Sequence, residues 1–231
     1  LLAAIAVAIA KRGDAAMARL ILAASAIHDN DLATAREHLL RTKRKSYMSL
    51  LQPMLMAWVN AGDKKYDAAV EALEQLASRK VFAPFKTYHT ALISDFTAHP
   101  GPAKAAFEET QKDNVRRATR VSLNYGGFLS RNGQRETALK LFGGILDGNP
   151  NNSVIKKGRE TLQKGDALSP PITTASEGVA EAFLSAAFAI SGSRGGEIAR
   201  IYSRLALYLR PDLDAASMLL AEVLESDMRY E

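Results

Sequence analysis

A recurring spacing of small and large side chains constrains the fold of this chain more than any other feature of its sequence. A small residue is followed twelve positions later by alanine and sixteen positions later by a larger side chain. Three stretches keep this spacing, and two keep part of it: Ala23/Ala35/Leu39, Ala91/Ala103/Phe107, Gly126/Ala138/Phe142, then Leu55/Ala69/Leu73 and Ala187/Ala199/Ser203. The alanines at 35, 69, 103, 138 and 199 are 34, 34, 35 and 61 residues apart. A period of this length indicates a repeated structural unit.

The remaining pattern is helical. Apolar residues recur at steps of three and four almost throughout, which predicts an all-α chain. Breakers such as Pro100-Gly101-Pro102 and Asn132-Gly133 separate helices of about a dozen residues. Small residues facing each other let two antiparallel helices approach closely, and the larger residue one turn later is expected to fill the space against the next pair. The sequence therefore predicts stacked helix pairs that form an α-solenoid.

These intervals resemble those of the tetratricopeptide repeat (TPR) family, whose motif places a small residue, Ala, a large apolar residue and Pro at fixed positions. Two stretches match it best: Tyr125, Gly126, Leu129, Gly133, Ala138, Phe142 and Pro150, then Ala187, Ala199, Ala206 and Pro211. The motif's tryptophan is missing from every unit, and the only tryptophan is Trp58. The resemblance covers nearly all of the chain and implies a right-handed α-solenoid of TPR-like antiparallel helix pairs.

The repeat predicts a domain organisation. Residues 1–152 are expected to hold TPR-like pairs at about 16–47, 48–83, 84–117 and 119–152, with a partial unit at 1–13. Residues 153–177 are expected to add a helix capped at Asn152-Ser153 and an extended linker that contains Pro170-Pro171. Thr174 followed by Glu177 predicts a capping box for the next helix. One further unit and a half unit follow at 178–231.

Composition and the two ends narrow the class of protein. The chain has no cysteine, which excludes disulfides, thiolate zinc sites and cysteine nucleophiles. The apolar run at residues 1–10 is about half as long as a bilayer span, so no membrane span is expected. The last helix carries an apolar stripe that needs a cover, which favours a longer protein or self-association through the terminal helices: Met218, Leu219, Leu220, Val223 and Leu224.

Two stretches, at residues 178–182 and 206–212, resemble a group of bacterial TPR proteins that are made with export signals. That resemblance implies the periplasm or cell envelope rather than the cytoplasm.

Catalytic patterns are sparse. The histidines at 28, 38, 89 and 99 are dispersed without metal-binding spacing, and each is expected on the surface or at a helix end. Ser153 and Lys156 match a Ser-x-x-Lys pattern, but Ser153 is already explained as part of a helix cap. The sequence therefore predicts no enzyme, no cofactor and no metal.

A basic cluster suggests an alternative role. Four cations, Arg41, Lys43, Arg44 and Lys45, follow the end of a predicted helix and could bind an anionic surface, either nucleic acid or acidic lipid. Cations at a helix C-terminus also complement the helix dipole, and no aromatic residues are interleaved with these. Nucleic acid is therefore the less favoured partner.

The TPR resemblance implies that certain motif positions face a concave groove. These positions hold Gln52, Met56 and Asn60, then Phe85, Tyr88, Leu92 and Asp95, then Arg120, Asn124 and Arg131. A mixed apolar and polar strip suits an extended peptide or a partner helix, although packing between units also accounts for the apolar members. The sequence thus favours a non-enzymatic protein-interaction scaffold whose partner it does not identify.

Overall fold

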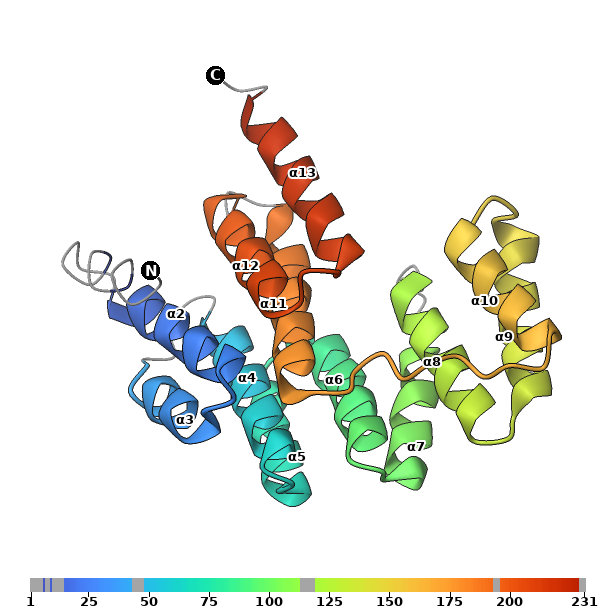
Figure 1. Cartoon of the computed structure of the whole chain (residues 1–231), viewed down its shortest axis with the longest axis horizontal. Helices are drawn as coiled ribbons and strands as arrows, with labels where there is room; N and C mark the ends of the chain where they lie inside the picture. The colour runs from blue at the N-terminus through green and yellow to red at the C-terminus, as the bar shows by residue number, and fades with distance from the viewer. Residues whose placement is uncertain are drawn as a thin grey trace. The chain divides into compact units, whose positions relative to one another are not determined.

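The computed structural model describes residues 6, 9, 15–42, 48–112, 119–192 and 196–228. Residues 227 and 228 are described by their backbone alone. Over these residues the chain forms helices and no strand, which confirms the all-α class (Figure 1). Two short 3-10 helices, η1 (Gln75–Ser78) and η2 (Lys80–Phe82), accompany the α-helices. The α-helices are α2 (Ala15–His28), α3 (Leu32–Leu40), α4 (Met48–Gly62), α5 (Tyr66–Glu74), α6 (Ala83–Phe96), α7 (Pro100–Thr110), α8 (Thr119–Arg131), α9 (Arg135–Gly148), α10 (Ser153–Gln163), α11 (Ala175–Ser191), α12 (Gly196–Leu209) and α13 (Asp214–Met228).

The chain divides into two compact units. Unit 1 comprises Leu1–His89 and Thr174–Glu231, and unit 2 comprises Thr90–Thr173, so the division lies inside α6. In unit 1, α2 packs against α3, α4 against α5, and α11 against α12. In unit 2, α8 packs against α9 and α10. The division into repeat units that the sequence suggests stays a prediction.

The turns inside the helix pairs repeat as regularly as the alanines. A residue with left-handed backbone lies two positions after the helix end at Asn30, Lys64, Ala98 and Gly133, with φ of 60°, 61°, 59° and 74°. The amide of the residue after each one donates to a carbonyl five positions back, as in a Schellman cap. Of these four residues, only Gly133 adopts a positive φ without steric cost. At the other three turns, the packing of the two helices that each turn joins must offset that cost.

The residues of the repeated spacing form the core of the pairs. The alanines at 35, 69, 103, 138 and 199 are 0% exposed, as is each larger residue four positions later. In unit 2, a Cβ on Gly126 would collide with the ring of Phe142, and one on Gly158 of α10 would lie 3.2 Å from it. Phe142 therefore fills space inside its own pair as well as against the next helix, whereas the sequence argument assigned it to the next pair alone.

Unit 1 contains packing that the repeat did not predict, because the last helices return to the first ones. In the chain's order α11 follows α4 by more than a hundred residues, yet the two lie side by side (Figure 1). Gly178 sits directly on the ring of Trp58, where any side chain would collide. On α12, Tyr208 stacks on His28 of α2 with ring centroids 4.5 Å apart. Unit 1 is thus built from both ends of the chain.

Both predicted helix caps are confirmed. The Asn152 side chain accepts a hydrogen bond from the amide of Ile155 at the start of α10. Thr174 and Glu177 form the complete capping box at the start of α11. Helix α10 ends before Gly165, whose φ of 96° explains the stop.

The stripe on α13 is covered only in part within unit 1, where two of its five residues are buried, Leu219 and Val223. Ala216, Leu219 and Val223 are buried, and α13 packs against α12 and α11. Met218 and Leu224 stay 65% and 36% exposed. Self-association through the terminal helices stays a prediction. None of the helices within the described residues combines the length and apolarity needed to cross a bilayer.

Candidate functional site

The predicted groove residues belong to both units. Gln52, Met56, Asn60, Phe85 and Tyr88 lie in unit 1, and Leu92, Asp95, Arg120, Asn124 and Arg131 lie in unit 2. Four of them are buried, at 4%, 8%, 1% and 6% exposure: Gln52, Tyr88, Leu92 and Asn124. The other six are partly exposed. Whether any of them contacts a peptide stays a prediction.

In unit 1 the chain's own α11 meets these residues. The Tyr88 hydroxyl donates to Oε1 of Glu181 on α11 at 3.1 Å, and Glu181 is only 2% exposed. Gln52 lies on α4, the helix against which α11 packs, and its amide donates to the carbonyl of Leu39 at 3.3 Å. The face formed by α4 and the start of α6 thus has a helix seated on it.

Asn60 has a structural role at the other end of α4. Its Oδ1 accepts from Arg36 of α3 at 3.2 Å, and its Nδ2 donates to the carbonyl of Ala68 in α5 at 3.1 Å. Arg36 also pairs with Asp63 and holds the pKa of that carboxyl below its usual range. One asparagine therefore ties two successive helix pairs together.

A buried polar cluster surrounds His89, and the expectation that this histidine lies at the surface or a helix end is wrong. His89 is 0% exposed; Trp58 Nε1 lies 3.0 Å from its Nδ1, and Ser185 Oγ lies 3.2 Å from its Nε2. The indole N–H can only donate, so Nδ1 accepts and the proton of the neutral ring is on Nε2. Nε2 then donates to Ser185.

This proton arrangement decides what the cluster can do. Burial lowers the pKa of His89 from 6.5 to about 4, partly opposed by the negative charge of Glu181, so the ring is neutral at pH 7. A histidine that donates to a serine hydroxyl cannot at the same time accept its proton. The pair of His89 and Ser185 therefore has the geometry of a structural hydrogen bond rather than that of a nucleophile and its base.

In unit 2 the groove residue Arg131 meets an extended segment of the chain, residues 164–173, which crosses α8 (Figure 1). Arg131 donates through Nη1 to the carbonyl of Leu168 at 3.0 Å and through Nη2 to Asp95 at 2.5 Å. The amide of Leu168 donates to Ser130 Oγ at 3.2 Å. Burial raises the pKa of Asp95, although Arg131 acts in the opposite direction. The contact with Asp95 thus orients the Arg131 side chain, which in turn binds the Leu168 carbonyl.

The basic cluster is described only in part. Arg41 is exposed and pairs with Glu37 one turn earlier at 2.5 Å. Lys43, Arg44 and Lys45 lie outside the described residues. Binding of an anionic surface through these cations stays a prediction.

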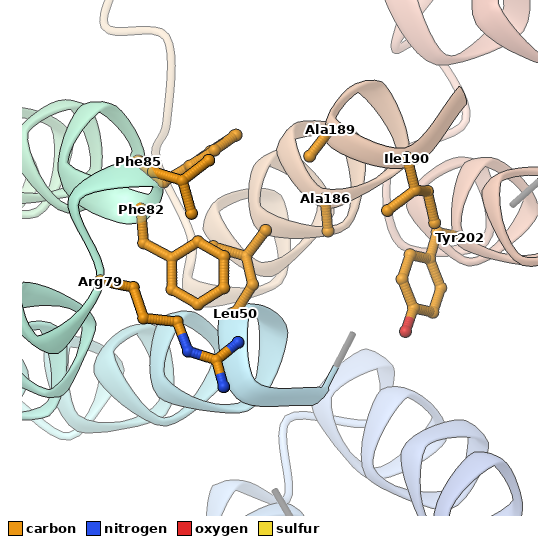
Figure 2. Close-up of a pocket in the computed structure, with 9 residues that line it drawn as sticks. Leu50, Arg79, Phe82, Phe85, Ala186, Ala189, Ile190 and Tyr202 are labelled. Carbon is orange, nitrogen blue, oxygen red and sulfur yellow. The ribbon is translucent and has the colours of Figure 1, made fainter. Parts of the chain in front are cut away.

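Unit 1 also contains an apolar pocket of about 330 Å³ (Figure 2). Helix α11 supplies one wall through Ala186 and Ala189, which are small and leave space where larger side chains would fill it. Ile190 also lies on α11, and the other lining residues come from α4, the η2 region, α6 and α12: Leu50, Arg79, Val81, Phe82, Phe85 and Tyr202. Arg79 carries the only formal charge among these described lining residues.

Sequence reasoning found one lining residue, Phe85, and missed the rest. The pocket exists because α11 returns to α4, and no short-range pattern signals that return. The available sequence signal was the apolar pair Val81 and Phe82 directly after Arg79 and Lys80, between two predicted helices.

No family model, curated protein or solved structure matches this chain. The case for a function therefore depends on the residues themselves.

Proposed function

We propose that this chain is a non-enzymatic protein-interaction scaffold, a right-handed solenoid of TPR-type helix pairs that binds a peptide or a partner helix. The binding surface is the face formed by the first helix of each pair. One observation carries the proposal: two segments of the chain already lie on such faces. Helix α11 lies on α4 in unit 1, and Leu168 of the extended segment 164–173 is held by the C-terminal end of α8 in unit 2. A partner would use the same contacts from a separate molecule.

The contacts to Leu168 are those that recognise an extended peptide. Its carbonyl and its amide are each held by a side chain of α8, from Arg131 and Ser130. Its side chain packs on Gly127 and Gly158, where an added Cβ would lie 3.5 Å and 3.7 Å from it. Paired main-chain hydrogen bonds supply affinity, and a notch for one apolar side chain supplies selectivity.

The TPR type is supported by the repeat of buried small residues and by the identical turns at 34- or 35-residue intervals. The non-enzymatic part is supported by the proton arrangement at His89, which leaves Ser185 without a base at that nitrogen.

Binding in trans tests the proposal. A labelled peptide of residues 164–173 is titrated into the full chain and into its Leu168→Asp variant, whose own segment is weakened because a carboxylate cannot occupy the apolar notch. The wild-type chain should bind the peptide poorly, since its tethered segment competes at an effective concentration on the order of millimolar. The variant should bind at least tenfold more tightly by fluorescence anisotropy, in line with the loss of that competitor.

Two controls make the outcome decisive. A peptide that itself carries Leu168→Asp should not bind, and adding Arg131→Ala to the variant chain should abolish binding of the unmodified peptide. Equal binding by both chains, or none by either, would contradict the proposal. Circular dichroism of each variant confirms that it remains folded.

A further inference from the structure

We propose that the apolar pocket of unit 1 binds a medium-chain aliphatic carboxylate, with the alkyl chain inside the pocket and the carboxylate on Arg79. This inference goes beyond the scaffold function and does not depend on it, because the peptide-contacting residues of α8 are not among the lining residues.

The walls suit a saturated chain. Leu50, Ala186 and Ile190 are at most 6% exposed and present only carbon to the pocket. Phe82 and Phe85 extend toward the same space from the segment that begins α6 (Figure 2). A volume of about 330 Å³ lies at the low end of the range of small-molecule pockets, roughly 300–1,000 Å³. The ligand should therefore be small, with an unbranched body that needs no polar partner.

Arg79 is placed to take the charged end. Its guanidinium carbon lies 5.4 Å from the centre of the Phe82 ring, and Nη1 donates to Ser49 Oγ at 3.4 Å. These contacts orient the group with little use of its five donors. Within the described part of the chain, no carboxylate forms an ion pair with it. A planar guanidinium of this kind matches a carboxylate with two parallel hydrogen bonds.

The sign of the charge excludes the other amphipathic classes. Arg79 is the charged residue among the described lining residues, and Lys80, next to it in the sequence, is exposed and positive as well. An alkyl ammonium would be repelled by Arg79, and an alcohol, which carries no charge, would form no ion pair with it. A carboxylate gains both the apolar burial and the ionic contact.

Isothermal titration calorimetry on the full chain compares three ligands with one alkyl length: decanoate, decanol and decyltrimethylammonium, each below its aggregation concentration. Decanoate should bind at least tenfold more tightly than decanol, because the ion pair with Arg79 adds to the shared burial. The ammonium should not bind. From hexanoate to octanoate to decanoate the affinity should rise about fifteenfold per two methylenes, and it should level off when the chain exceeds the pocket.

Two substitutions with matched controls locate the site. Arg79→Ala should lower decanoate affinity at least tenfold and leave decanol unchanged, while Lys80→Ala, beside it, should have a much smaller effect. Ala189→Trp fills the pocket and should abolish binding of both ligands. Phe188→Trp puts the same indole on the residue that precedes Ala189 in α11. Phe188 is 51% exposed and does not line the pocket, so this variant should leave binding intact.

Three results would overturn the inference. These are equal affinities for decanoate and decanol, decanoate binding that survives Ala189→Trp, and decanoate binding that Arg79→Ala leaves unchanged. A peptide that ends in leucine is the competing occupant. If that peptide binds through Arg79 and decanoate does not, the pocket belongs to a peptide terminus and the inference is wrong. The peptide test on α8 is independent, so either proposal can fail without the other.

Discussion

Replacing glycine by alanine should have opposite effects at two helix positions of unit 2. Gly144 lies inside α9, and a Cβ there meets nothing within 4 Å. Gly144→Ala therefore gains the full helix preference of alanine, about 1 kcal/mol. Gly126 lies inside α8, where the same Cβ would come closer than 3.0 Å to the Phe142 ring. The new methyl group and the ring cannot both keep their places.

The size of the loss follows from how tightly the ring is held. Phe142 is 0% exposed, and its other side faces Gly158, where a Cβ would lie 3.2 Å away. With no free side to move to, overpacking should cost about 3 kcal/mol, the upper end of its usual range. After the gain in helix preference, Gly126→Ala should destabilise the chain by about 2 kcal/mol. The two variants should then differ by about 3 kcal/mol, or roughly 6–12 °C in Tm.

Urea unfolding followed by far-UV circular dichroism measures the difference, with Gly144→Ala as the matched control. A double-mutant cycle with Phe142→Leu identifies the cause, because a smaller side chain should recover at least about 1 kcal/mol of the loss from Gly126→Ala. If Gly126→Ala is as stable as Gly144→Ala, the ring does not pack on Gly126 and the close helix approach is refuted.

Three further predictions concern stability. The pKa of His89 is about 4 in the folded chain against 6.5 for the free side chain, so the unfolded chain binds the extra proton first as the pH falls. The free energy of unfolding should therefore decrease by roughly 3 kcal/mol as the pH drops from 6.5 to 4. This part of the pH profile should be absent from His89→Gln. Ala98 and Gly133 occupy equivalent turns and both have positive φ, which glycine adopts without steric cost. In urea unfolding, Ala98→Gly should stabilise the chain by up to about 1 kcal/mol, and Gly133→Ala should destabilise it by about as much. Effects of the same sign for both variants would contradict this. Ser203→Ala should stabilise the chain by about 1 kcal/mol, because its buried hydroxyl has no hydrogen-bond partner among the residues that the structure describes. A loss in calorimetric Tm would show that the hydroxyl has one.

Features set by near neighbours could be predicted from the sequence. The helix class, the burial of the spaced alanines and the caps at Asn152 and Thr174 all depend on residues within one helix pair or one turn. Residue spacings over short stretches of the sequence determine these features, so the sequence alone predicts them.

Features set by distant segments could not. The return of α11 to α4 joins residues more than a hundred positions apart, such as Trp58 and Gly178, and no local pattern selects that pairing. The misplaced histidine did carry a signal. His89 shares a helix face with Phe85 and Leu92, at spacings of four and three, and that face is apolar. The apolar helix face on which His89 lies, rather than the residue type itself, predicts that its ring is buried.

The discontinuity of unit 1 has a consequence for synthesis on the ribosome. Residues 90–173 emerge as one stretch and can fold at once, whereas the helices at 15–89 must wait for α11 and α12. At about 5–20 residues per second, that wait lasts several seconds to tens of seconds. During it the apolar face of α4, including the Trp58 ring on which Gly178 will sit, has no cover from α11. The nascent N-terminal helices are thus a natural client for a chaperone until the last hundred residues have been translated.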